Sequence, residues 1–502
     1  MLDSPNDGHS TTNIGDDMSA TTPTASTAEQ PKRPLKTWEV AAISIGFMGP
    51  VMAMSLNGIG VAGLVGKAVP FTFLVSFIGT FLVAYGFIRL TRYFTHAGSV
   101  YALAGSTLGP RAGFFGGFAL LGTYLLFAAC IAGACSVFFE AMMAELGIEL
   151  PPMLWIAIPA VVAVVALALN LRESAVTART LLAIGFLGIA AMVVLSFVIL
   201  FRVGSGDAPV STGIDWSVFT PDGAPISAVM TAAVFAFLSW AGFESGTALG
   251  EEAENPRRVV PRALTLAVFI GGLVYVFVMF AQTIGFGTDE AGVAAFANSA
   301  STLTQLSSTY IGKWFSVLIS IIAFLVAFAS FLSSTVAASR LLFALARDGF
   351  GPKSFAHRNP KTAVPTVAVF FTVILTALMT IVLGLFGATS VDAYYWYATI
   401  ATLCMIIAYG MTSIGVIGYS LRQGSPIPKW EIVVPVLGLA FLVWVYVVQV
   451  AGQEAPYTYF PWIAAAWCLI GLIAVLSKPA LAQRIGARLT EQDPLIDEPS
   501  EA

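Results

Sequence analysis

Long runs of apolar residues, separated by short polar stretches, fill the sequence from residue 38 to residue 477. A helix needs about 20 apolar residues to cross the hydrocarbon core of a bilayer. Runs of about that length predict an all-α polytopic membrane protein with twelve transmembrane helices. The predicted spans are 38–62, 69–91, 112–141, 152–170, 177–202, 226–250, 263–287, 313–346, 364–386, 393–420, 431–451 and 458–477.

The distribution of charge supports this interpretation and orients the chain. Only 10% of the 502 residues are charged and 57% are hydrophobic, whereas soluble domains carry about 25% charged residues. Lysine and arginine are enriched on the cytoplasmic side of membrane proteins, so their asymmetry predicts that both termini are cytoplasmic. One set of connections carries Arg89, Arg92, Arg172, Arg179, Arg257, Arg258, Arg262, Arg347, Lys353, Arg358, Lys361, Arg422, Lys429, Lys478, Arg484 and Arg488, and the opposite set carries only Lys67, Arg202 and Lys313.

Two of the predicted spans are interrupted. The first contains Gly46, Gly49 and Pro50 near its centre, and the sixth is broken at 240–246, around the acidic Glu244. Proline removes a helical hydrogen bond, glycine is a poor helix former, and a carboxylate is costly inside the membrane. Paired interruptions at corresponding positions are typical of a transporter binding site, because they free backbone groups to face a ligand. In a single helix, such residues also serve close packing or a kink.

The spacing of the interruptions predicts how the chain is divided. They lie five spans apart, which predicts two five-span repeats of opposite orientation, at 36–203 and 204–423. Two further spans follow at 424–479. Residues 1–35 are predicted to be a disordered cytoplasmic tail, because they carry too few large apolar side chains to form a core. Residues 480–502 are predicted to be a cytoplasmic C-terminal tail.

Several other functional classes lack the residues that they need. The cysteines (Cys130, Cys135, Cys404 and Cys468) lie inside apolar runs and are predicted to be core residues rather than disulfides or metal ligands. With only three histidines, neither a metal site nor His-based catalysis is expected. The sequence shows no catalytic or cofactor motif and no filter-like repeat of a channel. A membrane sensor would need a signalling domain, for which 480–502 is too short.

Three blocks of the sequence resemble those of the amino acid–polyamine–organocation (APC) permeases. AGSVYALAGSTLGPRAGFFGGF at 97–118 is similar to that family's loop between spans two and three, and AGFESGTALGEEAENPRRVVPRA at 241–263 to its span six and the next loop. ASRLLFALARDGFGPKSFAHRNPKTAVP at 338–365 is similar to the end of its span eight and the following loop. The resemblance covers roughly 36–420 and implies a LeuT-type architecture of two inverted five-span repeats, with spans one and six discontinuous, plus two C-terminal helices. It also implies alternating access around a substrate held between spans one, three, six, eight and ten.

Carried over by position, the resemblance implies a substrate site lined by spans one, three and six. Free N–H groups of span one would hold a substrate carboxylate, and carbonyls of span six would hold an amine. Three aromatic residues of span six are candidate gates whose faces would attract an ammonium group, and each also suits ordinary packing. These gates are Phe237, Trp240 and Phe243, and the implied site also includes Gly46, Phe47, Met48, Gly49 and Met52 of span one, Thr123, Tyr124 and Phe127 of span three, and Ala241 and Gly242 of span six.

The first span departs from the family pattern. Where the family has a Gly-Ser/Thr-Gly core, this chain reads GFMGPVM, with Pro50 and Met52 at positions where glycines and backbone donors are expected. This departure favours a substrate with a weak or absent carboxylate, such as a polyamine or an ethanolamine-like amine, as the alternative to an amino acid.

The residues leave the coupling ion open. Many proton-coupled members of the family carry a lysine in span five, whereas this span has none and Gly185 lies near the expected position. Glu244 is then the candidate proton carrier, because burial favours the neutral form of a carboxyl group. Ser333 and Ser334 could instead hold Na⁺, although such hydroxyls often bond to their own backbone. Uniport or exchange without an ion is a further alternative.

Charged residues near the predicted cytoplasmic ends of spans six and eight are candidates for an inner gate. They would form a network that opens and closes during transport, or they would act only as topology signals and weak surface ion pairs. The set comprises Glu251, Glu252, Arg257, Arg258 and Arg347.

These patterns together predict a secondary transporter, and not an enzyme. It would move an amino acid or a related small amine across the cytoplasmic membrane by alternating access, with proton coupling. The alternatives are an organic cation transporter or exchanger of the polyamine or ethanolamine type, a Na⁺-coupled symporter, and a substrate-sensing membrane receptor. The expected partners are the amine-bearing solute, H⁺ and the lipid bilayer, with no nucleic acid and no cofactor. The sequence is compatible with a monomer and with a homodimer.

Overall fold

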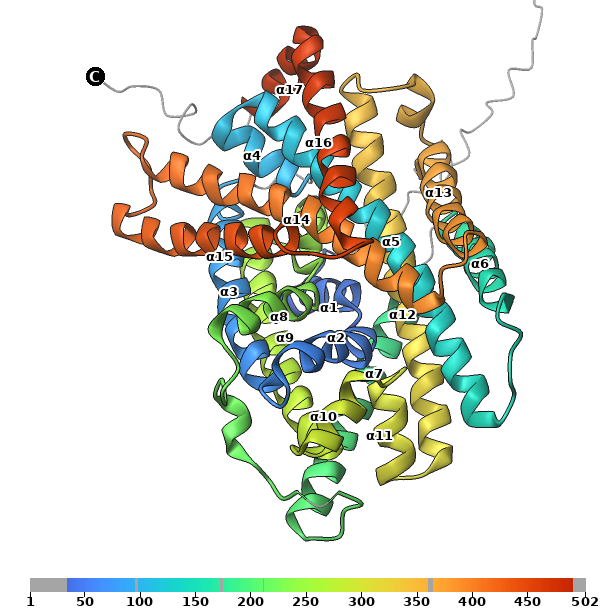
Figure 1. The fold of residues 1–502 in the computed structure, drawn as a ribbon. Helices are drawn as coiled ribbons and strands as arrows, with labels where there is room; N and C mark the ends of the chain where they lie inside the picture. Colours follow the sequence, from blue (N-terminus) through green and yellow to red (C-terminus); the bar gives the residue numbers. More distant parts are fainter. Residues whose placement is uncertain (1–33, 95–97, 172–174, 211, 360–363, 491–502) are drawn as a thin grey trace, which may run out of the picture. The chain divides into compact units, whose positions relative to one another are not determined.

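The computed structural model describes residues 34–94, 98–171, 175–210, 212–359 and 364–490. The chain from Leu35 onward forms one compact unit. The regular structure of these described residues is helical, apart from a single bridge between the backbones of Leu35 and Ala253 (Figure 1). Most of the predicted N-terminal tail lies outside the described residues. The predicted C-terminal tail begins with a helix, α17, and its remainder lies outside them as well.

The helices follow one another along the chain with short connections. In order they are α1 (Thr37–Met48), α2 (Pro50–Val65), α3 (Val69–Leu90), α4 (Val100–Leu108), α5 (Pro110–Leu146), η1 (Leu154–Ile156), α6 (Ala157–Asn170), α7 (Ala175–Gly204), η2 (Trp216–Phe219), α8 (Ile226–Leu238), η3 (Phe243–Glu252), α9 (Pro256–Phe286), α10 (Glu290–Ala297), α11 (Thr302–Tyr310), α12 (Lys313–Arg347), η4 (Lys353–Ala356), α13 (Thr366–Leu385), α14 (Ser390–Ser420), η5 (Lys429–Ile432), α15 (Val433–Val450), η6 (Tyr457–Tyr459), α16 (Phe460–Ser477) and α17 (Pro479–Thr490).

The apolar runs form helices that are long enough to cross a membrane. In the described part of the chain, nine single helices have the length and composition of membrane spans. Two helix pairs, α1 with α2 and α8 with η3, pass the same test together and bend by 41° at a short break. The stretch Leu154–Asn170 is a shorter apolar helix. In order, these elements correspond to the twelve runs predicted from the sequence, while the exact number of spans stays a prediction.

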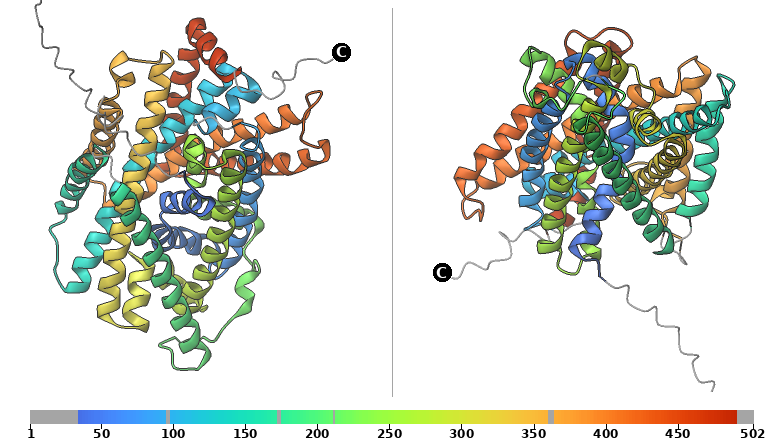
Figure 2. Two further views of the ribbon diagram at one scale, coloured as in Figure 1. Left: turned by 180° about the vertical axis from the view of Figure 1, so that it is seen from behind. Right: turned by 90° about the horizontal axis from the view of Figure 1, so that it is seen from below.

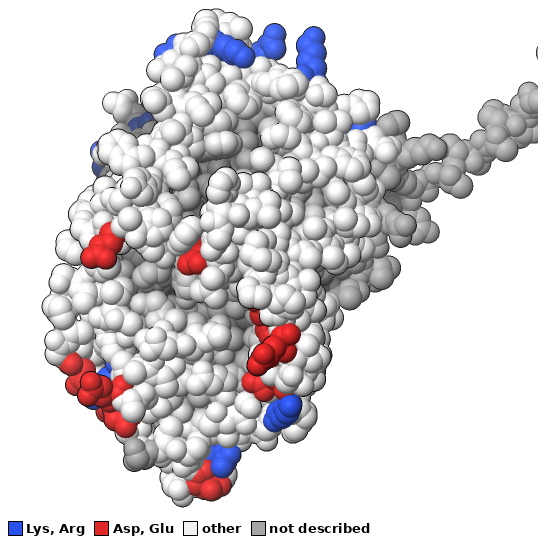
Figure 3. All heavy atoms as spheres, turned by 45° about the vertical axis from the view of Figure 1, so that its right-hand side comes forward, with Lys and Arg blue, Asp and Glu red and all other residues white. Residues whose placement is uncertain are grey.

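The helices differ in how much of their surface they bury. The apolar segment of α5 is 94% buried, whereas those of α7 and α15 are only 28% buried. A helix that is apolar on all sides must face the protein interior or lipid. The exposed side chains of α7, α15 and α16 are largely aliphatic or aromatic, as a lipid-facing surface requires. Figure 3 shows a face with few charged side chains: several lysines and arginines lie at the upper end, and acidic side chains with a few further basic ones lie in the middle and toward the lower end.

The central helices position the elements of the site. α5 packs against both α14 and α12, and α1 packs against α9, η3 and α12. Figure 2 shows α1 and α2, in blue, in the middle of the described unit. The two broken spans therefore meet inside the protein rather than at its edge.

All four cysteines take part in this interior. Cys130 and Cys135 lie on α5, Cys404 on α14 and Cys468 on α16, and each is buried and outside any disulfide. This confirms the prediction that they are core residues.

Candidate substrate site

The first broken span is divided at a single residue. α1 ends at Met48, Gly49 has a left-handed backbone (φ +59°, ψ +61°), and α2 begins with Pro50. Proline suits the first position of a helix, because its N–H would have no partner there and its φ is already helical. Pro50 therefore starts a second helix rather than kinking a continuous one. Within α2, the N–H groups of Val51 and Met52 have no carbonyl four residues earlier in the helix to bind, so they lie at the break.

The second broken span turns tightly between α8 and η3. Ser239, Trp240 and Ala241 each donate their N–H to a carbonyl three residues earlier. Gly242 has φ +93°, a conformation that strains any residue with a side chain. It also lies directly against span one, since a Cβ built on Gly242 would lie 1.9 Å from Cδ1 of Phe47. The contact between the two breaks therefore requires glycine at this position.

Phe47 also joins the breaks to span three. Its ring centroid lies 5.5 Å from that of Tyr124 and 6.1 Å from that of Phe127, on which it stacks. Tyr124 and Phe127 both belong to α5, and all three side chains are buried. The structure thus brings together Phe47, Tyr124, Phe127 and Gly242 of the predicted site.

Glu244 lies in the first turn of η3 and is fully buried. The hydroxyl of Tyr124 donates to its Oε1 at 2.9 Å, and the hydroxyl of Tyr409, from α14, donates to its Oε2. The rings of Phe87 and Phe243 pack edge-on against Tyr409. In the described part of the chain, no lysine or arginine forms an ion pair with Glu244. This Glu244 cluster (Glu244, Tyr124 and Tyr409) is a carboxyl group with two hydroxyl donors and no basic partner.

A serine of α12 bonds directly to span one. The hydroxyl of Ser330 donates to the carbonyl oxygen of Phe47 at 2.6 Å. The two residues considered for sodium lie one turn further on. Ser333 donates to the carbonyl of Ala329 and Ser334 to that of Ser330, so both hydroxyls bond to their own helix in this conformation.

A buried hydrogen-bond network joins α2 to the break in span six and to α14. Asn57 donates from Nδ2 to Oγ of Ser239 at 2.8 Å and accepts at Oδ1 from the hydroxyl of Tyr394 at 2.7 Å. All three residues are buried. We call Asn57, Ser239 and Tyr394 the Asn57 network. Its member on α14, Tyr394, precedes Tyr409 by 15 residues, which corresponds to about 22 Å along the helix at 1.5 Å per residue. The Asn57 network and the Glu244 cluster therefore lie at different depths.

The three candidate aromatic gates point in different directions. Trp240 stacks on Phe77 of α3 at 6.2 Å, and Phe237 packs against α15. Only Phe243 adjoins the Glu244 cluster. The physical reason is the positive φ of Gly242, which turns the chain between Trp240 and Phe243. Trp240 and Phe237 are therefore packing residues in this conformation.

The remaining predicted lining residues also differ in orientation. Thr123 donates its hydroxyl to the carbonyl of Ala119 in its own helix. The side chain of Met48 reaches α9, where a Cβ built on Gly271 would lie 3.4 Å from its Cε. A Cβ built on Gly46 meets no atom within 4 Å, so open space adjoins the last turn of α1.

Four of the five charged residues considered for an inner gate lie on an exposed surface. Glu252 pairs with Arg340, which was not part of the predicted set, at 3.7 Å between Oε1 and Nη1. Both side chains are about half exposed, and such pairs contribute little to stability. Of the other members, Arg257 and Arg258 are exposed, Arg347 lies 3.8 Å from its neighbour Asp348, and the side chain of Glu251 lies outside the described residues.

Three residues of the site are absent from the sequence-based set: Tyr409, Ser330 and Asn57. Asn57 carries a usable signal, because an amide inside a membrane helix is costly unless it finds a partner. Ser330 lies one helical turn before Ser333, on the same face of α12. Tyr409 gives no signal, because an aromatic residue inside an apolar run is usual.

Comparison with known sequences places this chain among permeases. A family model described as amino acid permease matches residues 35–475. The branched-chain amino acid permease BcaP of Bacillus subtilis (strain 168) is 26% identical over 469 residues, which cover 88% of this chain and 92% of that protein. The low-affinity putrescine importer PlaP of Escherichia coli (strain K12) is 26% identical over 334 residues, which cover 66% of this chain and 70% of that protein.

Comparison with solved structures supports the fold. The crystal structure of a mutant manganese transporter from Eremococcus coleocola superposes with a TM-score of 0.54, covering 90% of this chain and 95% of that chain. At 12% sequence identity, this likeness concerns the fold alone. The predicted fold class, an all-helical transporter fold of the LeuT type, is confirmed.

Proposed function

Because this chain belongs to the amino acid permease family, we propose that it moves an amino acid or a related small amine across the cell membrane by alternating access. Both termini would lie in the cytoplasm, in accordance with the distribution of lysine and arginine along the sequence. The named relatives support both substrate classes, since one is a branched-chain amino acid permease and another a putrescine importer.

The observation that carries this proposal is the Glu244 cluster. A carboxylate buried without a cation is strongly disfavoured in an interior of low dielectric. The hydroxyls of Tyr124 and Tyr409 satisfy both carboxyl oxygens but supply no countercharge. The group is therefore suited to take up a positive charge from outside the protein, either a proton or a substrate ammonium. We assign the coupled proton to Glu244.

The start of α2 supports a position for the other end of the substrate. The N–H groups of Val51 and Met52 and the positive end of the helix dipole suit a substrate carboxylate. An amino acid would then bind with its carboxylate at α2 and its ammonium group at the carbonyls of the span-six turn. Pro50 offers no N–H, which favours an amine without a carboxylate as the second candidate.

Uptake into proteoliposomes tests the proposal. The wild-type protein should accumulate substrate when the outside is more acidic than the lumen. Glu244→Gln keeps the size and hydrogen-bonding ability of the side chain but cannot exchange a proton. We expect this variant to lose the response of uptake to the pH gradient while its melting temperature stays close to that of the wild type. Glu254→Gln, at an exposed glutamate outside the candidate gate residues, is the matched control and should keep the response.

Each alternative predicts a different result in the same assay. A pH response that persists in Glu244→Gln would show that Glu244 does not carry the coupled proton. Uptake that requires Na⁺ would shift the coupling to the serines of α12, Ser330, Ser333 and Ser334. Stabilisation by polyamines but not by amino acids in a thermal-shift screen would identify the amine class. Failure to take up any of these solutes would overturn the proposed transport function.

A further inference from the structure

A cavity of about 230 Å³ lies at the end of α16, away from the site described above. α16 is apolar over a length that suits a membrane span and ends at Ser477. The cavity is lined by residues that follow directly, including Lys478 and Arg484, and by Asp348 and Gly349 at the end of α12. It therefore lies where the apolar part of the bilayer meets its headgroups.

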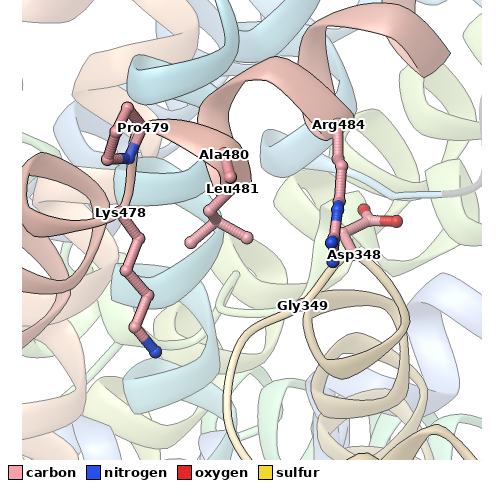
Figure 4. A pocket seen from close by; sticks show the side chains of 7 residues that line it. All are labelled: Asp348, Gly349, Lys478, Pro479, Ala480, Leu481 and Arg484. Carbon is pink, nitrogen blue, oxygen red and sulfur yellow. The ribbon is translucent and has the colours of Figure 1, made fainter.

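The cavity has a positive side. Lys478 and Arg484 are exposed, and Figure 4 shows their side chains extending in the same direction on two sides of Leu481. The first residues of α17, Pro479 and Ala480, also line the cavity, so the positive end of this 12-residue helix contributes as well.

The carboxylate in the cavity already has partners within the protein. Asp348 is buried and accepts a hydrogen bond from the hydroxyl of Tyr101 on α4. Arg347 lies 3.8 Å from the same carboxylate. The lining of the cavity thus combines one carboxylate, which has partners of its own, with two cationic side chains, Lys478 and Arg484.

The backbone also makes room on this side of the cavity. Gly349 has φ +112°, and a Cβ built on it would lie 3.0 Å from Nη1 of Arg484. A side chain at position 349 would crowd the guanidinium group. Glycine therefore lets Arg484 lie across the end of α12.

We propose that this cavity binds a phosphate group between Lys478 and Arg484, carried by an anionic lipid headgroup or present as free inorganic phosphate. Arginine binds phosphate oxygens through two parallel hydrogen bonds, and lysine adds a point charge. Basic pockets between helices at a bilayer surface are suited to such headgroups. This volume is far larger than the ~15 Å³ of cavity volume that one water molecule requires, so the cavity has room for a polyatomic anion.

A phosphate bound in the cavity would link α17 to the end of α12. α17 packs on α4 and α5 through a buried face that includes Leu481 and Ile485, and α4 is bonded to the end of α12 through Tyr101 and Asp348. A phosphate held between Arg484 and Lys478 would stabilise α17 against the end of α12. We therefore expect the ligand to raise the stability of the folded protein.

Thermal unfolding of the purified full-length protein tests the proposal in two arms. In detergent, inorganic phosphate is titrated against chloride at equal ionic strength. In nanodiscs, phosphatidylglycerol is compared with phosphatidylcholine. The variant Lys478→Gln combined with Arg484→Gln should weaken the stabilisation at least tenfold in ligand concentration, because each charge-assisted hydrogen bond to phosphate is lost. Lys429→Gln, an exposed lysine outside the cavity, is the matched control and should behave as wild type.

The outcomes separate the two sources and can overturn the site. Stabilisation by phosphatidylglycerol alone identifies a lipid headgroup, and stabilisation by inorganic phosphate alone identifies the free anion. Equal stabilisation of the wild type and the double variant in both arms, or none in either arm, would refute the proposal. If the double variant does not fold, Lys478→Gln alone provides the same comparison, since its exposed side chain can be changed without disturbing the core. None of these readouts depends on transport.

Discussion

Replacing Asn57 by alanine should weaken the conformation in which α2, the span-six turn and α14 are held together. The Asn57 side chain makes hydrogen bonds of 2.8 and 2.7 Å to the hydroxyls of Ser239 and Tyr394. Alanine removes both bonds and leaves these two hydroxyls buried. The lost hydrogen bonds join α2 to Ser239, at the end of α8, and to Tyr394 of α14. The substitution should therefore favour separation of these elements and leave each helix itself intact.

The structure allows the size of this effect to be estimated. An unmet hydrogen bond in a buried site costs about 1–3 kcal/mol, and interhelical hydrogen bonds in membrane proteins average about 0.6 kcal/mol. For two bonds at a residue that is 1% exposed, we expect a total of about 2 kcal/mol. Because 1.4 kcal/mol corresponds to a factor of ten, the equilibrium should shift about 30-fold toward conformations in which these elements separate.

Hydrogen exchange measured by mass spectrometry reports this shift directly. Peptides from α2 and α8 should exchange about 30-fold faster in Asn57→Ala where separation limits exchange. Asn170→Ala is the matched control, because Asn170 also bonds across a helix contact, to Thr335 at 3.1 Å, but away from both breaks. Adding Tyr394→Phe to Asn57→Ala should cost less than the sum of the single changes, since both remove the same bond. Equal exchange of α2 in Asn57→Ala and Asn170→Ala would refute the reasoning.

Two further predictions concern the span-six turn and the connection before η2. Gly242→Ala should destabilise the protein by about 2–4 kcal/mol, because it combines a strained backbone with a clash against Phe47, and lower its melting temperature. Gly46→Ala should have little effect, and equal melting temperatures for the two variants would contradict the close contact. Hydrogen bonds from Ser217 and then Lys67 lower the pKa of Asp215 to about 2, below the value near 3.9 expected in the unfolded chain. The resulting stabilisation is present above pH 4 and is lost as the pH falls toward 2, so Asp215→Asn should flatten the decline in melting temperature over that range; an unchanged decline would show that other groups cause it.

The order and approximate bounds of the helices along the chain could be predicted because the length of each apolar run largely decides them. Spanning a bilayer demands a minimum length of apolar sequence, and that demand is visible without knowledge of packing. Even the two breaks lie where glycine, proline and Glu244 interrupt apolar runs. The local conformation was harder to predict. Treated as one continuous helix, span one places Pro50 in an interior position, whereas in the structure Gly49 ends one helix and Pro50 begins the next.

The partners of Glu244 could not be predicted from the sequence. Tyr409 lies on α14, an apolar helix in which periodicity does not distinguish the face toward the site from the face toward its neighbours. Its contact with Glu244 depends on how α14 packs against α5, which involves residues far apart in the chain. The orientation of Trp240 was equally hard to predict, since an aromatic residue beside a break suits both a gate and the contact with Phe77 that it makes in this structure.

The burial of all four native cysteines has a practical consequence for spectroscopy. Thiol reagents react with accessible thiolates, and these side chains are enclosed by α5, α14 and α16 and their neighbours. A cysteine introduced at an exposed helix end would then be labelled selectively in the otherwise unaltered chain. Pairs of such labels on α2 and α14 would report the distance between the two helices while substrate, protons or Na⁺ are added.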